Sequence, residues 1–254
     1  MSLRTQARAA ARICYFNGII PLWRQPLLMG AVFLTPFSFL FFLYVIAQRA
    51  ELPFGILGGV LFTVLFTGNG MLNDCAYLRL ERQLQQVFVV SPVRPLAYVL
   101  GMALSELAFA LPALLLFLAI LASVHPFGAG ALVLLTGVIV LTWLMATSLG
   151  FLISTFFKQL REIWPIGTLV FSTLSVLPPL FYPIAVIPAG WRWAAFLAPS
   201  TFAGQLADFA VGLPPAGGFA PAVLGSPWFD LAGLVGSTLL FALAATFLSR
   251  WREP

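Results

Sequence analysis

The sequence predicts an all-α polytopic membrane protein. Its expected parts are six transmembrane helices, an N-terminal amphipathic interfacial helix, and two short re-entrant helices between spans five and six. Of the 254 residues, 61% are hydrophobic and only 8% are charged. A soluble domain carries roughly 25% charged residues, so this chain could not cover its own surface with polar groups in water. The composition therefore excludes a soluble enzyme, a disordered protein and a nucleic-acid-binding protein.

Six segments are long and apolar enough to cross a bilayer. A crossing helix needs ~20 mostly apolar residues, because the helical rise is ~1.5 Å per residue and the hydrocarbon layer is ~30 Å thick. The six expected spans are Leu27–Ala47, Gly55–Asn73, Leu96–Ser123, Gly130–Phe156, Ile163–Tyr182 and Phe229–Ser249. Pro178 and Pro179 are expected to disrupt the end of span five.

The spans divide the chain, residues 1–254, into the parts of a single transmembrane domain. Residues 1–26 form the interfacial helix, 27–182 hold spans one to five, 183–228 form the outer re-entrant segment, and 229–249 form span six. No second domain is expected.

The N-terminal segment places Arg4, Arg8 and Arg12 on one stripe of a helix, with mostly Ala, Ile, Leu and Phe elsewhere. This pattern is typical of an amphipathic helix that lies on the inner membrane surface. The alternative is a solvated basic tail.

The outer segment 183–228 is strongly apolar but contains seven prolines, so no piece of it is long enough to cross the membrane. Short apolar helices of this kind are expected to be re-entrant or interfacial. We expect two of them, Trp191–Leu197 and Ser200–Val211, to dip into the outer leaflet.

The basic residues predict the orientation. Eleven of the 13 Lys and Arg residues lie in the two termini and the loops on one side of the spans, and only Arg49 and Arg192 lie on the other. The positive-inside rule places both termini in the cytoplasm. Cys14 and Cys75 then face a reducing compartment, so no structural disulfide is expected.

The cytoplasmic stretch from Asp74 to Pro95 mixes charged residues with an apolar stripe. A short helix that docks on a cytoplasmic partner has this pattern. The alternative is a plain connecting loop, with Ser91 and Pro92 starting the third span.

Glu106 is the one ionisable side chain expected well inside a span. It lies ~15 Å along the helix from Leu96, near the bilayer centre. A buried acid is costly there and is a candidate functional residue. The alternative is a structural role, as a protonated side chain bonded to a neighbouring helix. No Lys or Arg lies in the spans, so an intramembrane ion pair is not expected.

Spans two and five carry most of the remaining buried polarity. Polar side chains at helical spacing face a neighbouring helix or a cavity rather than lipid. Helix-to-helix hydrogen bonding and lining of a pathway are both open readings. The candidate pathway residues, with Glu106, are Thr63, Thr67, Asn69, Asn73, Thr168, Ser172 and Ser175.

No phosphate-binding G-x-x-x-x-G-K-[ST] loop is present, so the chain is not expected to bind ATP or any other cofactor itself. One histidine and two cysteines are too few for a histidine or thiolate metal centre. A different class, an intramembrane lipid-modifying enzyme built around Glu106 and His125, needs further polar residues clustered at one interface. A non-transporting membrane scaffold is a third class.

Two stretches carry a family resemblance. LERQLQQVFVVSPVRPLAYVLG is similar to a Glu…Leu…Ser-Pro-Val pattern that leads into span three, and LPPLFYPIAVIPAGWRWAAFLAPSTFAGQLADF is similar to the end of span five and its Pro-rich outer turn. With the six spans and the basic N-terminal helix, the chain resembles the membrane subunits of ABC type-2 exporters. Ala198-Pro199 stands where Asn-Pro is commoner, and Arg94-Pro95 where Ser-Arg is common, which leaves the subfamily open.

The resemblance implies a homodimer in a prokaryotic plasma (inner) membrane that pairs with two copies of a separate ATPase subunit. That subunit would bind ATP and Mg. Spans two and five would line the pathway, and the segment between spans two and three would dock on the ATPase. Its expected coupling residues are Glu81, Arg82, Leu84, Val87, Ser91 and Pro92.

Bulky groups beside Pro178 and Pro179 suggest an apolar outer gate where two copies meet near the two-fold axis. Interrupted backbone at membrane depth is tolerated where it is buried in protein or lines a cavity. The expected gate residues are Leu177, Leu180, Phe181 and Tyr182. The expected cargo is hydrophobic or amphipathic: a drug-like molecule, a lipid or a lipid-linked glycan, with Phe171 as a further channel aromatic.

Overall fold

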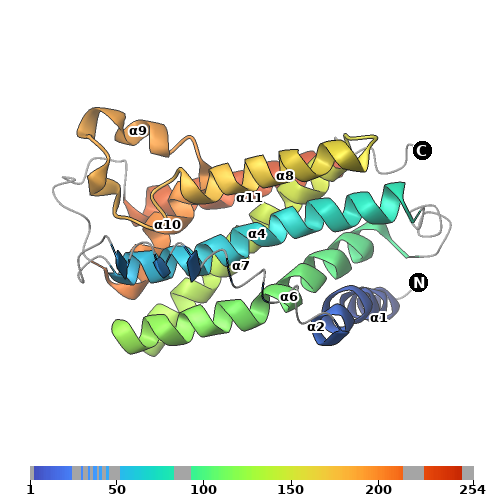
Figure 1. Cartoon of the computed structure of the whole chain (residues 1–254), viewed down its shortest axis with the longest axis horizontal. Helices are drawn as coiled ribbons and strands as arrows, with labels where there is room; N and C mark the ends of the chain where they lie inside the picture. The colour runs from blue at the N-terminus through green and yellow to red at the C-terminus, as the bar shows by residue number, and fades with distance from the viewer. Residues whose placement is uncertain are drawn as a thin grey trace.

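The computed structural model describes residues 3–24, 52–82, 93–213 and 226–247, together with positions 30, 34, 37, 38, 40, 41, 44 and 45. In this part of the chain the secondary structure is helical, with connecting turns and no strand. Figure 1 shows long helices running side by side. Helix α1 (Leu3–Cys14) lies at one end of the bundle, and α9 (Arg192–Ala195) and α10 (Pro199–Val211) lie at the other.

Four described helices are long and apolar enough to cross a membrane. They correspond to the expected spans two, three, four and six, and they are α4 (Leu52–Leu80), α6 (Pro95–Val124), α7 (Ala129–Ser154) and α11 (Pro227–Phe247). The chain is therefore an all-helical, multi-pass membrane protein in its described part. Of the 21 positions of the expected first span, Leu27–Ala47, the structure describes eight, all of them helical, and the span as a whole stays a prediction.

The fifth expected span is shorter than Ile163–Tyr182. Helix α8 (Leu160–Val176) has 17 residues, which is ~25 Å at the helical rise. It ends at its C-cap, Leu177, immediately before Pro178. Neither Pro178 nor Pro179 has a backbone N–H to continue the helical hydrogen bonds, so the expected disruption at Pro178-Pro179 is confirmed.

The second expected span is longer than Gly55–Asn73. Helix α4 continues through Asp74 to Leu80, residues that the charge pattern had assigned to a cytoplasmic connection. The extra turns are stable because their polar side chains have partners. Asp74 bonds to Glu106 of α6, and Arg79 bonds to the carboxyl end of α7.

The N-terminal segment is helical from Leu3 to Arg24, through α1, a π-helical turn (Tyr15–Ile19) and α2 (Ile20–Arg24). All three arginines of the α1 stripe are exposed, whereas Gln6 and Ala10 are buried against α6. Gly101 of α6 permits this approach, because a Cβ there would lie 2.9 Å from the Cβ of Ile13. The expected amphipathic helix is confirmed, and its place on the membrane surface stays a prediction.

The outer segment contains both expected short helices. The first comprises 3-10 turns at Ile184–Val186 and Ala189–Trp191 followed by α9, and the second is α10. Two hydrogen bonds fix α10 at this end. Nε2 of His125 donates to the carbonyl of Val211 at 2.9 Å, and Oγ of Ser200 donates to the carbonyl of Leu174 at 2.5 Å. Gly212 ends the helix in the left-handed conformation, with φ 73°. The depth of the two short helices in a bilayer stays a prediction.

Helices α4 and α7 approach each other at a pair of glycines. A Cβ on Gly150 would lie 2.1 Å from the carbonyl oxygen of Gly68, and a Cβ on Gly68 would lie 2.5 Å from the carbonyl oxygen of Ala146. Only glycine fits at this crossing, because the obstacle on each side is backbone. Small residues of this kind let membrane helices pack closely. Close packing matters there because the hydrophobic effect does not drive helices together within lipid.

We therefore expect Gly150→Ala to destabilise the protein by about 1–3 kcal/mol, the usual cost of overpacking. The matched control is Gly137→Ala on the same helix, where a Cβ meets nothing within 4 Å. Thermal unfolding of the detergent-solubilised protein, followed by fluorescence-detected gel filtration, measures both. Equal midpoints for the two variants would contradict the crossing described here.

Candidate functional site

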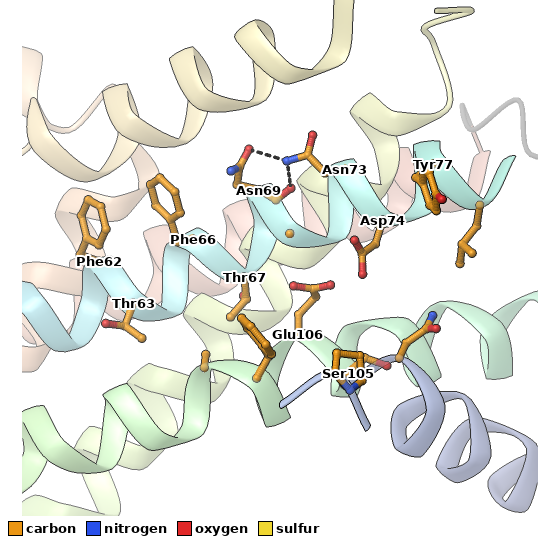
Figure 2. Close-up of a pocket in the computed structure, with 16 residues that line it drawn as sticks. Phe62, Thr63, Phe66, Thr67, Asn69, Asn73, Asp74, Tyr77, Ser105 and Glu106 are labelled. Carbon is orange, nitrogen blue, oxygen red and sulfur yellow. Dashed lines mark hydrogen bonds between the residues drawn. The ribbon is translucent and has the colours of Figure 1, made fainter. Parts of the chain in front are cut away.

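A cavity of about 750 Å³ lies beside α4, between that helix, α6 and the N-terminal helices. Among the described residues, α4 contributes its length from Phe62 to Leu78, α6 contributes Ser105 to Ala110, and the N-terminal segment contributes Asn17 and Pro21. Figure 2 shows Thr63, Thr67 and Asp74 of α4 on the side that faces Glu106 of α6. The side chains of Phe62, Phe66, Asn69 and Asn73 lie on the other side of α4 in this view. Cavities of this size hold drug-sized ligands.

Five of the candidate pathway residues line this one cavity: Thr63, Thr67, Asn69, Asn73 and Glu106. The polar residues of span two thus share a cavity with the acid of span three. The hydroxyl group of each threonine already donates within its own helix. Thr63 donates to the carbonyl of Gly59 at 2.8 Å, and Thr67 donates to the carbonyl of Val64 at 2.6 Å.

The two acids of the cavity form a pair. The carboxyl groups of Asp74 and Glu106 share a hydrogen bond and point toward each other in Figure 2. Such a bond needs a proton on one carboxyl group, so at most one of the two carboxyl groups is ionised while it lasts. Gly70 makes room for it, because a Cβ on Gly70 would lie 1.8 Å from Oε2 of Glu106.

Asp74 is a candidate site residue that the sequence analysis missed, because its charge was taken to mark the end of span two. The helical spacing held a usable signal: Thr63, Thr67, Gly70 and Asp74 follow one another at i, i+4, i+7 and i+11, on one face. An acid in register with a polar stripe extends the stripe. The partner of Glu106 in the described part of the chain is thus a second acid.

The three candidate pathway residues of α8 are not part of this cavity lining. Thr168 is exposed, Ser172 is half-buried, and Ser175 is buried with no hydrogen-bond partner for its Oγ among the described residues. The face of α8 that packs on α4 is formed by neighbouring positions, since Gly167 meets Asn69 and Phe171 meets Gly68. A role for the α8 stripe in a pathway stays a prediction.

The expected gate residues divide into two groups. Leu180 and Phe181 are 3% and 5% exposed, and both pack on Gly58 of α4. Leu177 is 73% exposed, and its carbonyl accepts a hydrogen bond from the hydroxyl of Tyr182 at 2.9 Å. Of the four, Leu177 is therefore the one whose side chain is free to meet a second copy, and the gate itself stays a prediction.

Two of the expected coupling residues are described. Glu81 and Arg82 are exposed in the turn that follows α4, and Arg82 donates from Nε to the hydroxyl of Tyr77 at 3.0 Å while its guanidinium lies 5.5 Å from that ring. The other four, Leu84, Val87, Ser91 and Pro92, lie outside the described residues. Helix α6 begins at Pro95, with Arg94 extended before it, so the alternative start at Ser91-Pro92 is wrong.

Arg79 joins the end of α4 to the turn between α7 and α8. It donates from Nη1 to the carbonyl of Thr155 at 2.9 Å and from Nη2 to that of Ser154 at 2.6 Å, with a further bond to the carbonyl of Phe157. A cation at the carboxyl end of a helix complements the helix dipole and satisfies carbonyls that have no intrahelical partner. The charge of Arg79 is thus turned away from the acid pair.

Glu106 and His125, the two residues of the alternative intramembrane enzyme, do not come together. Glu106 and His125 are 19 residues apart on one helix, ~28 Å at the helical rise, and the ring of His125 is bonded to α10. No group of three or more His, Cys, Asp or Glu residues within the described ranges could hold a metal ion.

The family model for ABC-2 type transporters matches residues 10–207. The match covers most of the chain, so the chain belongs to this family and is a membrane permease subunit of an ABC-2 type transporter. A chain of this kind is not itself catalytic, and its family implies pairing with an ABC ATPase subunit. No curated protein matches the chain.

The Arg79 contacts predict that Arg79→Ala loosens the joint between α4 and α7. Loss of hydrogen bonds from a charged donor to partly buried carbonyls should cost about 2 kcal/mol of unfolding free energy. Arg161→Ala, at an exposed arginine in the first turn of α8, is the control. Equal thermal midpoints for the two variants would show that the joint carries no stability.

Proposed function

We propose that this chain is the transmembrane subunit of an ATP-driven ABC exporter that moves a hydrophobic or amphipathic molecule out of the cytoplasm. Two copies of the chain pair with two copies of a separate ATPase, which binds ATP and Mg. The observation that carries the proposal is the cavity beside α4, in a chain of the ABC-2 family, lined by the polar residues of α4 and by Glu106.

The charge distribution supports the proposed orientation. One end of the bundle holds the arginines of α1, Arg79 in the last turn of α4, Arg82 in the turn that follows, Arg94 before α6 and Arg161 at the start of α8. Arg192 lies in α9, at the other end. The positive-inside rule then places the α1 end and both termini in the cytoplasm of a prokaryotic inner membrane.

The cavity is placed for loading from the cytoplasmic half. It extends along α4 from Phe62 to Leu78, ~24 Å at the helical rise, and Leu78 adjoins the turn that carries Glu81 and Arg82. A substrate held there lies next to the segment that we propose docks on the ATPase. ATP-driven closure of the ATPases would move α4 and α7 together, because Arg79 joins their ends.

Copurification tests the proposal. When the tagged chain is produced with its ABC ATPase subunit, we expect the two to purify in equal amounts and ATP hydrolysis to rise with an amphipathic compound. Glu81→Ala should keep the complex but lose most of the stimulated hydrolysis, because Glu81 is exposed in the proposed coupling turn. Glu162→Ala, another exposed acid at this end, is the control. Failure of the ATPase to bind the wild-type chain would refute the proposed function.

The outer gate gives a second prediction. Leu177→Ala should raise basal ATP hydrolysis or leak with an unchanged thermal midpoint, since its side chain is 73% exposed. Leu180→Ala should instead lower stability by about 2–5 kcal/mol, as for other buried leucines. Leu169→Ala, at a leucine that is 68% exposed on α8, is the matched control. Identical leak in the Leu177 and Leu169 variants would remove Leu177 from the gate.

A further inference from the structure

The walls of the α4 cavity suit a ligand with an apolar, ring-containing body. Phe62 and Phe66 stack with their ring centroids 4.7 Å apart, and Phe109 and Tyr77 add two more rings to the lining. Aromatic faces attract cations as well as apolar groups, because the ring quadrupole is negative at its face.

The cavity has acidic side chains but no basic ones. Asp74 and Glu106 line it together, and none of the described lining residues is a Lys, Arg or His. Two cations lie near the cytoplasmic end of α4, but neither faces the pair. Arg79 is bonded to α7 carbonyls, and Arg82 is exposed over the ring of Tyr77.

The hydroxyl groups that line the cavity also suit a ligand that donates a hydrogen bond. The protons of Thr63, Thr67 and Ser105 are used on backbone carbonyls at 2.6 to 2.8 Å, which leaves their oxygens as acceptors.

We propose that the cargo of this transporter is a lipophilic cation, an amphipathic molecule with an aromatic or aliphatic body and one positively charged nitrogen or equivalent centre. The inference rests on the proposed function and names its substrate class. Within the membrane a cation is costly, and it favours ionisation of a neighbouring carboxyl group, so its contact with the acid pair offsets that cost. The aromatic residues of the lining suit the apolar body. An anionic lipid-linked glycan has no basic partner among the described lining residues, so we expect it to be a poorer cargo than a cation.

Direct binding tests this, with tetraphenylphosphonium as the cationic probe and tetraphenylborate, in separate samples, as the anionic probe of the same shape. Binding is measured without ATP in phosphatidylcholine nanodiscs that hold the complete transporter, and the signal of empty nanodiscs is subtracted. We expect saturable binding of the cation and at least ~10-fold weaker binding of the anion. A wild-type protein that binds no cation, or that binds the two ions equally well, would overturn the inference without any variant.

The variants Asp74→Asn and Glu106→Gln, singly and together, keep the shape and hydrogen-bonding capacity of the pair and remove its charge. We expect the double variant to bind the cation at least ~10-fold more weakly, in line with the loss of a buried charge contact. Glu162→Gln, the same kind of change at an exposed acid outside the cavity, should leave the Kd unchanged. An unchanged Kd in the double variant would overturn the role of the pair.

Copurification and the binding measurement test the two proposals separately. Copurification of the ATPase reports on the proposed function, whereas charge preference is read without ATP and does not depend on hydrolysis. A transporter that retains its ATPase but shows no charge preference refutes only the cationic cargo.

Discussion

The fold depends on the close approach of other segments to the backbone of α4. Its glycines face in several directions, and each accepts a different neighbour. A Cβ on Gly58 would lie 2.5 Å from the carbonyl oxygen of Leu180, one on Gly59 would lie 2.8 Å from the ring of Phe117, and one on Gly68 would lie 2.3 Å from the ring of Phe171. Between apolar helices in lipid, packing of this kind replaces the hydrophobic effect as the source of association. A helix with side chains at these positions would hold its neighbours farther away.

The same helix also carries the polar groups of the cavity, and the two roles use different residues. Gly70 takes part in both roles, because its lack of a side chain leaves space for the carboxyl group of Glu106. The acid pair in turn permits α4 to stay helical past Asn73, because Asp74 finds a partner on α6 instead of needing water. Packing and polarity are thus coupled at one turn of α4.

Periodicity and composition predicted the helices well, because length and apolarity are local properties of a segment. The bounds of α6, Pro95–Val124, lie within one residue of the expected Leu96–Ser123. The misplaced end of α4 had a non-local cause, since Asp74 and Arg79 are stable in a helix only through partners on α6 and α7. The burial of Phe181 could likewise not be predicted from the sequence, because it depends on Gly58 of α4, more than a hundred residues earlier. The five cavity residues that were predicted share a simple signal, polar side chains at helical spacing within an apolar span.

These contacts make α4 the mechanical link between the two ends of the molecule. At one end Arg79 binds the carboxyl end of α7, and at the other Gly58 receives the Leu180–Phe181 turn. Gly58 and Arg79 are 21 residues apart, ~32 Å along a continuous helix, and the cavity lies between them. Within the proposed function, a tilt of α4 driven from the ATPase side would therefore move the outer turn in the same step. A rigid helix with a fixed contact at each end transmits such a tilt, whereas a break near the cavity would let the two ends move independently. Asp74 lies on this unbroken helix. The contact proposed for a cationic cargo and the tilt driven by the ATPase would therefore act on the same helix.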